Sequence, residues 1–409
     1  MFNWRLVTLL LSGIGISTLG DFIYLIAINL LVYEMTQSAT AVAGLWIVGP
    51  ITSILTNSWS GSIIDRANKK KIMIIADLAR AAGVGIIPFV SNIWTIYVLL
   101  FLISVARAFF APSSTTYIAK LIPVNKRKKF NSINSLVTSG AFIVGPSIAG
   151  ALFLIGSVKI AILLNAVSFL ISAFIIMFLP DTDQQANPAE VKKGSYETLR
   201  DDWKEVIQFG REKSFVLAIY ACFLAFGLFS LTLDSQEVVF IQDVVGLTET
   251  DYSFLVSITG IGYSLGAFLV TVATRFLSIK HLIAGGMLMV AIGYLIYALS
   301  NSFVAIAIGF TILGFFNAFS NTGFSTFYQN NVPIHLMGRM TSVIGVIQSG
   351  AQIVFLLLIG VLGDISPLRY TIVILAGLNM ILSVFIVILV AKPGKQVYFS
   401  VGKEETVEY

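Results

Sequence analysis

The chain is poor in charge, and this scarcity restricts its function more than any other property. Only 11% of its 409 residues are Asp, Glu, Lys or Arg, whereas 57% are hydrophobic. A soluble domain carries about 25% charged residues, so this chain lacks the polar surface that water requires. Its long apolar runs instead predict a protein whose solvent is the lipid bilayer. The net charge of +5 provides no basic face for nucleic acid.

Residues and motifs needed for several other functions are also scarce. Cys222 is the single cysteine, which excludes an internal disulfide and a thiolate metal cluster. The two histidines, His281 and His335, fall in connections between apolar runs, which argues against a metal site or a histidine proton relay. There is no Gly-rich loop followed by Lys-Ser or Lys-Thr, and no nucleophile–base constellation for hydrolysis. We therefore expect no enzyme, no metal and no cofactor, and no cleavable signal peptide, because the first apolar segment is too long.

Twelve apolar segments are long enough to cross a membrane, because a helix needs about 20 residues to do so. The sequence therefore predicts an all-α integral membrane protein. The predicted spans are residues 6–33, 41–63, 71–90, 93–118, 132–156, 159–179, 214–242, 252–273, 281–300, 303–328, 340–363 and 368–391.

The placement of Lys and Arg predicts the orientation of these spans. With both termini in the cytoplasm, 22 of the 26 basic residues lie inside, Arg80 and Arg107 lie within spans, and only Lys159 and Arg369 lie outside. The reverse orientation would place the basic cluster at residues 126–129 outside, against the positive-inside rule. We therefore expect a multi-pass protein with both termini cytoplasmic.

An internal repeat divides the chain into two halves. With a shift of 210 residues, segment 107–152 overlays segment 317–362 with twelve identities in 46 positions, including Pro, Ser and Gly. A shift of 213 pairs Asp21 with Asp234. Two parallel halves related by an axis along the membrane normal place a shared cavity between them, which suits alternating access. The predicted parts are an N-terminal six-helix bundle (1–180), a cytoplasmic linker with an amphipathic helix (181–213), a C-terminal six-helix bundle (214–392) and a cytoplasmic tail (393–409).

Acidic side chains inside the spans are candidates for function, because a charge in the bilayer is costly. Asp21 lies in the middle of span one and shares a helical face with Ser17 and Tyr24. A carboxyl group out of water can exchange protons near neutral pH, so we predict that Asp21 couples protons to transport. Asp234 is its repeat partner, and Glu237 lies one predicted turn further on the same face. The alternative for these two is the wetted outer end of span seven.

Other polar and aromatic residues complete the candidate site. Asp77 and Arg80 are spaced i,i+3 in span three, which predicts an intramembrane ion pair. Span four carries a further membrane-embedded arginine, Arg107. Aromatic and amide side chains are expected to line a cavity for a bulky amphiphilic or cationic substrate, although periodicity alone does not assign them. The candidate cavity residues are Tyr24, Phe109, Phe226, Asn317, Phe319, Gln348 and Gln352.

The connection after span two, Gly61-Ser-Ile-Ile-Asp65-Arg66-Ala-Asn68-Lys69-Lys70-Lys71, resembles the G-x-x-x-D-R-x-G-R-K signature of the major facilitator superfamily. Asn68 stands where the signature has its second glycine, and Asn tolerates a left-handed turn. The resemblance implies that Asp65 lies against the positive N-terminal end of span eleven. A simple positive-inside loop is the alternative. The implied conformational latch comprises Gly61, Asp65, Arg66, Lys69 and Lys70.

Span five contains Gly145-Pro146 and Gly150, and it resembles the small-residue pattern of antiporter branches of that superfamily. Small residues let helices approach closely and Pro146 bends the span; general helix packing is the alternative. The resemblance also implies that Arg107 tunes a nearby carboxylate. Relatives carry this arginine about one turn earlier, where this chain has Ile103, so a structural anchor is equally consistent.

Together these features resemble a major facilitator of the macrolide- and multidrug-efflux type. The resemblance implies twelve transmembrane helices in two pseudo-symmetric six-helix bundles, acting as a monomer in a bacterial plasma membrane. It implies proton-coupled export of small amphiphilic or cationic compounds by alternating access, with the substrate, protons and lipid as its partners. An importer or facilitator of a metabolite or lipid-like solute on the same fold remains an alternative, and a non-transporting membrane sensor is less favoured.

Overall fold

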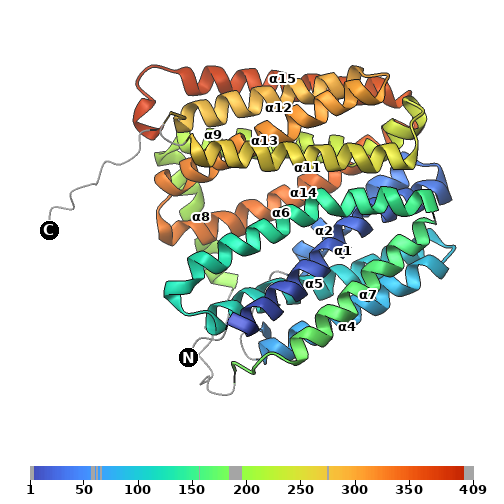
Figure 1. Cartoon of the computed structure of the whole chain (residues 1–409). Helices are drawn as coiled ribbons and strands as arrows, with labels where there is room; N and C mark the ends of the chain where they lie inside the picture. Colours follow the sequence, from blue (N-terminus) through green and yellow to red (C-terminus); the bar gives the residue numbers. More distant parts are fainter. Residues whose placement is uncertain are drawn as a thin grey trace. The chain divides into compact units, whose positions relative to one another are not determined.

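The computed structural model describes residues 4–56, 60, 63–64, 67–155, 157–183, 196–273 and 276–399 (Figure 1). Its described residues form helices, turns and loops without any strand. Twelve helices are long and apolar enough to cross a membrane. The predicted all-α class and the number of spans are therefore confirmed.

Apart from the fifth, the spans of the first half begin close to their predicted positions. Between the last of them and the second half lies the predicted amphipathic helix, α8 (Tyr196–Glu212), which buries Val206 and Phe209. The six spans are α1 (Trp4–Thr36), α2 (Ala39–Thr56), α4 (Lys69–Ile86, continued by the 3-10 turn η1, Ile87–Phe89), α5 (Ile93–Leu121), α6 (Val124–Ile155) and α7 (Val158–Met177).

The second half repeats this order, with one irregular segment after its first span. That segment comprises the short helix α10 (Glu237–Val239) and the π-helix η2 (Phe240–Val244), and a 3-10 turn η3 (Gln396–Phe399) follows the last span. The six spans are α9 (Ser214–Asp234), α11 (Glu249–Val272), α12 (Ile279–Leu299), α13 (Phe303–Asn331), α14 (Ile334–Ile365) and α15 (Leu368–Ala391).

Two helices begin earlier than predicted, and both follow a repeat-related proline. Span five was expected from residue 132 and span eleven from residue 340, whereas α6 begins at Val124 and α14 at Ile334. Pro123 and Pro333 stand directly before these starts, where proline has the backbone angle of a first helical turn and its missing N–H is not needed. Hydropathy misses these turns because they are polar extensions of the apolar spans.

The chain forms two compact units that do not coincide with its two halves. Unit 1 contains Met1–Lys192, Ser235–Ser257 and Gln352–Ile365, and unit 2 contains Lys193–Asp234, Ile258–Ala351 and Ser366–Tyr409. Unit 1 therefore joins the first six spans to the outer ends of α11 and α14. Inner and outer here denote the ends that the charge distribution predicts to face the cytoplasm and the outside.

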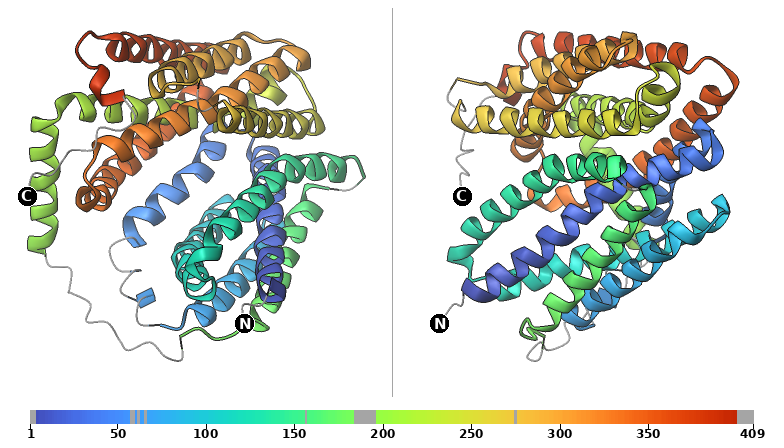
Figure 2. Two further views of the ribbon diagram at one scale, coloured as in Figure 1. Left: turned by 60° about the vertical axis from the view of Figure 1, so that its left-hand side comes forward. Right: turned by 45° about the vertical axis from the view of Figure 1, so that its right-hand side comes forward.

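Within each unit the helices pack in a bundle (Figure 2). In unit 1, α1 packs against α6 and α7, and α4 packs against α5 and α7. In unit 2, α12 packs against α13 and α15, and α9 packs against α15. Glycine allows close approach within these bundles: a Cβ at Gly293 of α12 would lie 2.9 Å from the carbonyl oxygen of Gly309 on α13.

Candidate functional site

Asp21 lies at a crossing of α1 and α7 in unit 1. Its neighbour Gly20 has no room for a side chain, because a Cβ there would lie 2.5 Å from the Oδ1 atom of Asn165 on α7. The glycine thus lets α7 approach until the wholly buried Asn165 interacts with the Asp21 carboxylate. Arg80 and Arg107 act on the same carboxylate electrostatically. The structure therefore brings together Asp21 and both predicted intramembrane arginines.

Arg80 is held in place by three neighbours. Its Nη2 atom contacts Oδ1 of Asp77, so the ion pair suggested by the i,i+3 spacing is formed. The guanidinium lies between two aromatic rings, 4.3 Å from the centroid of Phe110 and 4.2 Å from that of Phe169. Asp77 is 0% and Arg80 4% exposed, so the pair is dry and its cation–π contacts contribute about 2 kcal/mol. Arg80 is therefore a fixed positive charge near Asp21.

Tyr24 lies one turn beyond Asp21 on α1. Its hydroxyl is buried and finds no hydrogen-bond partner among the described residues, and the charge of Asp21 acts on it. A buried hydroxyl without a partner costs about 1–3 kcal/mol. The hydroxyl is therefore available to a water molecule or to a polar group of a substrate.

A second polar cluster lies in unit 2 around a single acid, Asp234, at the end of α9. The Tyr294 hydroxyl donates a 2.7 Å hydrogen bond to Oδ1 of Asp234. Asn379 of α15 is wholly buried, and its Nδ2 atom donates to Oγ of Ser230, 3.3 Å away. Asp21 thus faces two guanidinium groups, whereas the side chain that donates to Asp234 is a neutral phenol.

The two clusters occupy corresponding positions of the internal repeat. Each combines an acid of its half's first span, a side chain of the third span and an asparagine of the sixth. Sequence reasoning missed the asparagines and the tyrosine, although an amide repeated inside two apolar spans was a usable signal. The corresponding pairs are Asp21 and Asp234, Arg80 and Tyr294, and Asn165 and Asn379, offset by 213, 214 and 214 residues.

Glu237 does not extend the face of Asp234, so that expectation was wrong. The helix α9 ends at Asp234, and Gln236 has φ −106° and ψ 4° before Glu237 begins α10. Asp234 closes a segment of unit 2, whereas Glu237 belongs to unit 1. Apolar periodicity continues through this break, which is why the sequence suggested one span over residues 214–242.

Asp364 of α14 caps the N-terminus of α2 within unit 1. Its Oδ1 atom accepts from the Ala39 amide at 2.6 Å, and Oδ2 accepts from the Ser38 hydroxyl at 2.7 Å and the Thr40 amide at 3.2 Å. A carboxylate at a helix N-terminus satisfies free amides and the positive end of the helix dipole. This contact, which sequence reasoning did not find, ties the outer end of a second-half span to a first-half span.

Repeat-related glycines make further contacts at the outer ends. A Cβ at Gly150 of α6 would lie 3.0 Å from Cβ of Ser253 on α11, and one at Gly360 of α14 would lie 3.0 Å from Cβ of Ala43 on α2. Gly150 and Gly360 differ by 210 positions, as do Ala43 and Ser253. Span five thus packs on span eight as span eleven packs on span two.

The rest of the predicted small-residue pattern packs inside unit 1. A Cβ at Gly145 would lie 2.6 Å from Cβ of Phe22 on α1, and Pro146 lies within α6. Two residues further along α6, the Ser147 hydroxyl forms a 2.9 Å hydrogen bond with Ser257 of α11. This part of α6 therefore contacts α1 through one face and the outer end of α11 through another.

The predicted latch is only partly within the described residues. Gly61, Asp65 and Arg66 lie outside them. Lys70 donates from Nζ to the carbonyl oxygens of Met177 and Leu179, at 2.8 and 2.6 Å. It therefore binds the inner end of α7 in its own bundle.

Asn68 and Lys69 bind the acids that follow span six. Asn68 has φ −70° and ψ 117° and caps α4 by accepting from the Lys71 amide, so the expected left-handed turn was wrong. Its Nδ2 atom donates to Asp181 at 2.7 Å, and the Lys69 amide donates to Asp183 at 2.6 Å. Asn68 therefore caps a helix at the position where the family signature has its second glycine.

Asp183 connects three inner segments of unit 1. Lys120, at the inner end of α5, donates to its Oδ1 atom at 2.5 Å. Partial burial opposes ionisation, but the hydrogen bonds from Lys120 and the Lys69 amide outweigh it and hold the pKa of Asp183 below its usual value. The carboxylate is therefore charged at neutral pH and links α4, α5 and the segment after α7.

The predicted cavity residues are divided between the two units. Phe226 and Phe319 are buried, and Phe319 packs in a hydrophobic cluster with Val270 and Leu282, so packing accounts for its position. The others are half-buried. Tyr24, Phe109 and Gln352 belong to unit 1, and Phe226, Asn317, Phe319 and Gln348 belong to unit 2.

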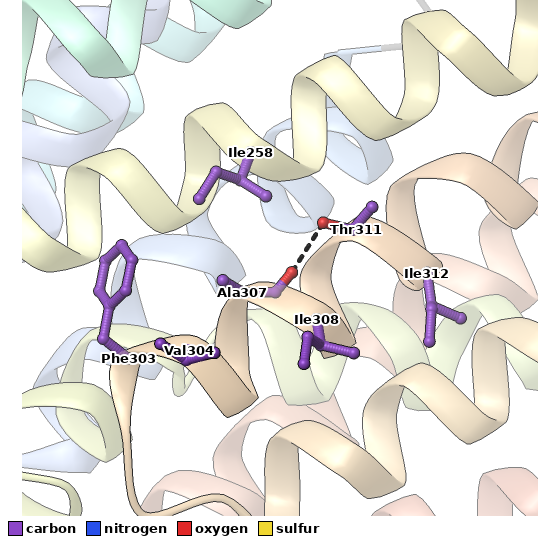
Figure 3. Close-up of a pocket in the computed structure, with 7 residues that line it drawn as sticks. All are labelled: Ile258, Phe303, Val304, Ala307, Ile308, Thr311 and Ile312. Atoms are coloured by element: carbon purple, nitrogen blue, oxygen red, sulfur yellow. Dashed lines mark hydrogen bonds between the residues drawn. The ribbon is translucent and has the colours of Figure 1, made fainter.

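A groove of about 360 Å³ lies between α11 and α13 of unit 2 (Figure 3). Its single hydroxyl, on Thr311, donates to the Ala307 carbonyl oxygen at 2.8 Å, so the groove offers a ligand little besides hydrocarbon. It contains none of the predicted cavity residues. The lining residues are Ile258, Phe303, Val304, Ala307, Ile308, Thr311 and Ile312.

Comparison with known proteins finds one family whose sequence model matches the chain. The sequence model of the Major Facilitator Superfamily matches residues 10–239 and again 235–407. The chain is 27% identical over 366 residues to the uncharacterized MFS-type transporter YfiS of Bacillus subtilis, covering 87% of this chain and 85% of the relative. It is 22% identical to Macrolide efflux protein A of Streptococcus pyogenes (88% and 90% covered) and 23% to Multidrug efflux pump Tap of Mycolicibacterium fortuitum (90% and 92%).

Solved structures show the same fold at lower identity. The crystal structure of nucleoside transporter NupG superposes with a TM-score of 0.72 at 14% identity, over 95% of this chain and 99% of that one. A bacterial homologue of the iron transporter ferroportin, in its inward-facing state, gives 0.74 at 15%, over 96% and 100%.

Proposed function

The chain belongs to the major facilitator superfamily of membrane transporters, and we propose that it exports small amphiphilic or cationic compounds in exchange for protons. Two relatives that align over most of its length are named as efflux proteins, which supports the direction of transport. We further propose that it works in a bacterial plasma membrane with both termini in the cytoplasm.

The observation that carries proton coupling is the Asp21 cluster. A carboxyl group in a span is expensive unless it has a function, and here Gly20 and Asn165 hold it in one position. Two arginines lie near Asp21 and keep their positive charge, so the net charge of the site changes by one unit when Asp21 gains or loses a proton. A substrate cation and a proton can therefore replace each other at Asp21 with little change in local charge.

In the proposed cycle, Asp21 takes up a proton from outside as the substrate leaves, and it releases that proton toward the cytoplasm as the next substrate binds. One charge moving down a potential of about 100 mV releases roughly 2.3 kcal/mol. The contacts that Asp364 makes with α2 hold the outer ends together in this scheme, and they must break when the site opens outward.

Asp234 provides the second titratable position. Its hydrogen bond from the neutral Tyr294 can persist in both protonation states of the acid, because a carboxyl group retains acceptor oxygens when protonated. We propose that it acts with Asp21 as a repeat-related partner, one acid in each half.

The test is uptake of a fluorescent cationic dye into everted membrane vesicles, with and without an imposed proton gradient. We expect gradient-dependent accumulation that Asp21→Asn abolishes while its expression stays normal. Glu212→Gln is the matched control, because it neutralises an exposed carboxylate of α8 and should transport like the parent protein. Full gradient-driven uptake by Asp21→Asn would refute the assignment of Asp21.

Import or facilitated passage of a metabolite is the second candidate. If a broad dye panel gives no gradient-dependent accumulation while labelled metabolites equilibrate across the vesicle membrane, this candidate replaces the first.

A further inference from the structure

Four aromatic rings form a column along the inner halves of α9 and α13 in unit 2. The rings alternate between the helices. Tyr328 lies 5.3 Å from Tyr220, Tyr220 lies 5.5 Å from Phe324, and Phe324 lies 3.7 Å from Phe223, measured between centroids. The planes of these pairs differ by only 24°, 21° and 2°. Each ring is half-buried, so the column has one side open.

The column stops at Phe223 because the next positions carry no ring. One turn further along α9 is Gly227, and the α13 position three residues before Phe324 is Asn321. A Cβ built on Gly227 would meet no heavy atom within 4 Å, and Gly227 itself is exposed. An open space therefore lies where a fifth ring would continue the column.

Several α13 positions near Phe324 along this helix are polar. Asn321 and Ser325 of α13 are exposed, and Asn317 is half-exposed one turn away. The Asn321 Nδ2 atom donates to the Asn317 carbonyl oxygen at 3.0 Å and also to the Oδ1 atom of Asn317, so the remaining hydrogen-bonding capacity lies on Oδ1 of Asn321 and Nδ2 of Asn317. Exposed amides are unfavourable against hydrocarbon, so this face of α13 suits a water-filled path better than lipid.

We propose that the space beside Gly227 is a binding slot for a planar aromatic cation, which stacks on Phe223 and continues the column. This inference rests on the proposed export function and names a substrate class for it. Aromatic faces are electron-rich and attract both flat rings and cations. The parallel planes orient the incoming ring, and the Asn321 amide lies where it can bind polar groups at the ring edge.

A binding slot explains why position 227 is a glycine. Glycine in a helix interior is less favourable than alanine, and here no neighbouring atom requires it. A side chain at this position would instead occupy the space over Phe223.

The direct test is equilibrium binding of ethidium to the purified full chain by fluorescence anisotropy. Gly227→Phe would place a ring in the slot, and Phe223→Leu would remove the stacking surface. We expect each to weaken ethidium binding roughly tenfold, the size of one aromatic stacking or cation–π contact. Gly377→Phe on α15 is the matched control, since a Cβ there also meets nothing within 4 Å, and it should bind ethidium like the parent protein.

Transport by everted vesicles then separates this inference from the proposed function. Gly227→Phe should lose ethidium uptake but keep uptake of tetrapentylammonium, a cation without rings. Parent protein that binds ethidium but moves neither cation would refute export and leave the slot standing. Equal ethidium binding by the parent protein, Gly227→Phe and Phe223→Leu would overturn the slot whatever transport shows.

Discussion

Replacing Asp364 with asparagine removes the charge that caps α2, and we expect the outer ends of unit 1 to separate more often. The change keeps the size of the side chain but loses one acceptor oxygen and the negative charge. Asp364 accepts two backbone amides and one hydroxyl. Loss of such a cap costs about 0.5–2 kcal/mol, and the lost interaction with the helix dipole adds about 0.3–1 kcal/mol.

A total near 2 kcal/mol corresponds to a shift of roughly 30-fold in the equilibrium between closed and open outer ends. The neighbouring contacts remain in the variant, since Gly360 still lies against Ala43. The shift is therefore a change in population, and the protein should still fold and insert.

The assay measures how fast a buried outer position becomes accessible. Ser257 is 3% exposed beneath α6, and Ser257→Cys is nearly isosteric. In a background with Cys222→Ser, which removes the only other thiol, a membrane-impermeant maleimide reports each opening. We expect labelling to become at least tenfold faster when Asp364→Asn is added.

Asp251→Asn is the matched control for this assay. Asp251 also caps a helix of unit 1, but it accepts from the Thr248 amide of its own turn, at 3.0 Å, and the structure records no bond from it to another span among the described residues. It should leave the labelling rate unchanged. If Asp364→Asn labels within twofold of its parent, the cap does not hold the outer ends together, and the reasoning fails.

Three further substitutions test the packing and the polar clusters. Gly20→Ala should lower the melting temperature and reduce transport, because overpacking of a tight crossing costs about 1–3 kcal/mol; Gly85→Ala, whose Cβ would meet its neighbour at an ordinary 3.6 Å, should do neither. Tyr294→Phe leaves Asp234 without its 2.7 Å donor, so it should destabilise the protein by about 1–3 kcal/mol and change the pH dependence of dye uptake, whereas unchanged stability would contradict the observed bond. Asp183→Asn should be less stable than the parent protein at pH 7. A carboxylate whose pKa is lowered in the folded state stabilises the fold above its unfolded pKa, and this contribution is lost as the pH falls through the folded-state pKa. The difference in stability should therefore persist to about pH 5 and vanish only in acid.

The sequence was sufficient for the architecture because hydrocarbon imposes one demand on every span. Backbone groups in lipid must be paired within a helix, so length and apolar content predict where helices lie. They predict breaks poorly. The interruption at Gln236 carries no proline or glycine, and the apolar pattern continues to Val244, so nothing in the sequence separates Asp234 from Glu237.

Polar partners were harder to predict, because they depend on which faces meet. The approach of Asn165 to Asp21 requires Gly20 at the same crossing, and a glycine in a span has many other uses. The Asp364 cap joins residues more than 300 positions apart, and hydropathy places both only at span ends. The repeat is the one sequence signal that relates the two polar clusters, because Asn165 and Asn379 are offset by 214 residues as Asp21 and Asp234 are by 213.

The structure gives the two halves the same packing but different chemistry. Gly150 and Gly360 make equivalent contacts, yet the residue that corresponds to Asp364, 210 positions earlier, is Leu154, which is 71% exposed. The α2–α14 contact therefore has charge-assisted hydrogen bonds, whereas the α6–α11 contact has the neutral bond between Ser147 and Ser257. Charge-assisted bonds are roughly twice as strong as neutral ones. The α2–α14 contact therefore holds the outer ends together more strongly than the α6–α11 contact does, and loss of the Asp364 charge weakens the stronger of the two.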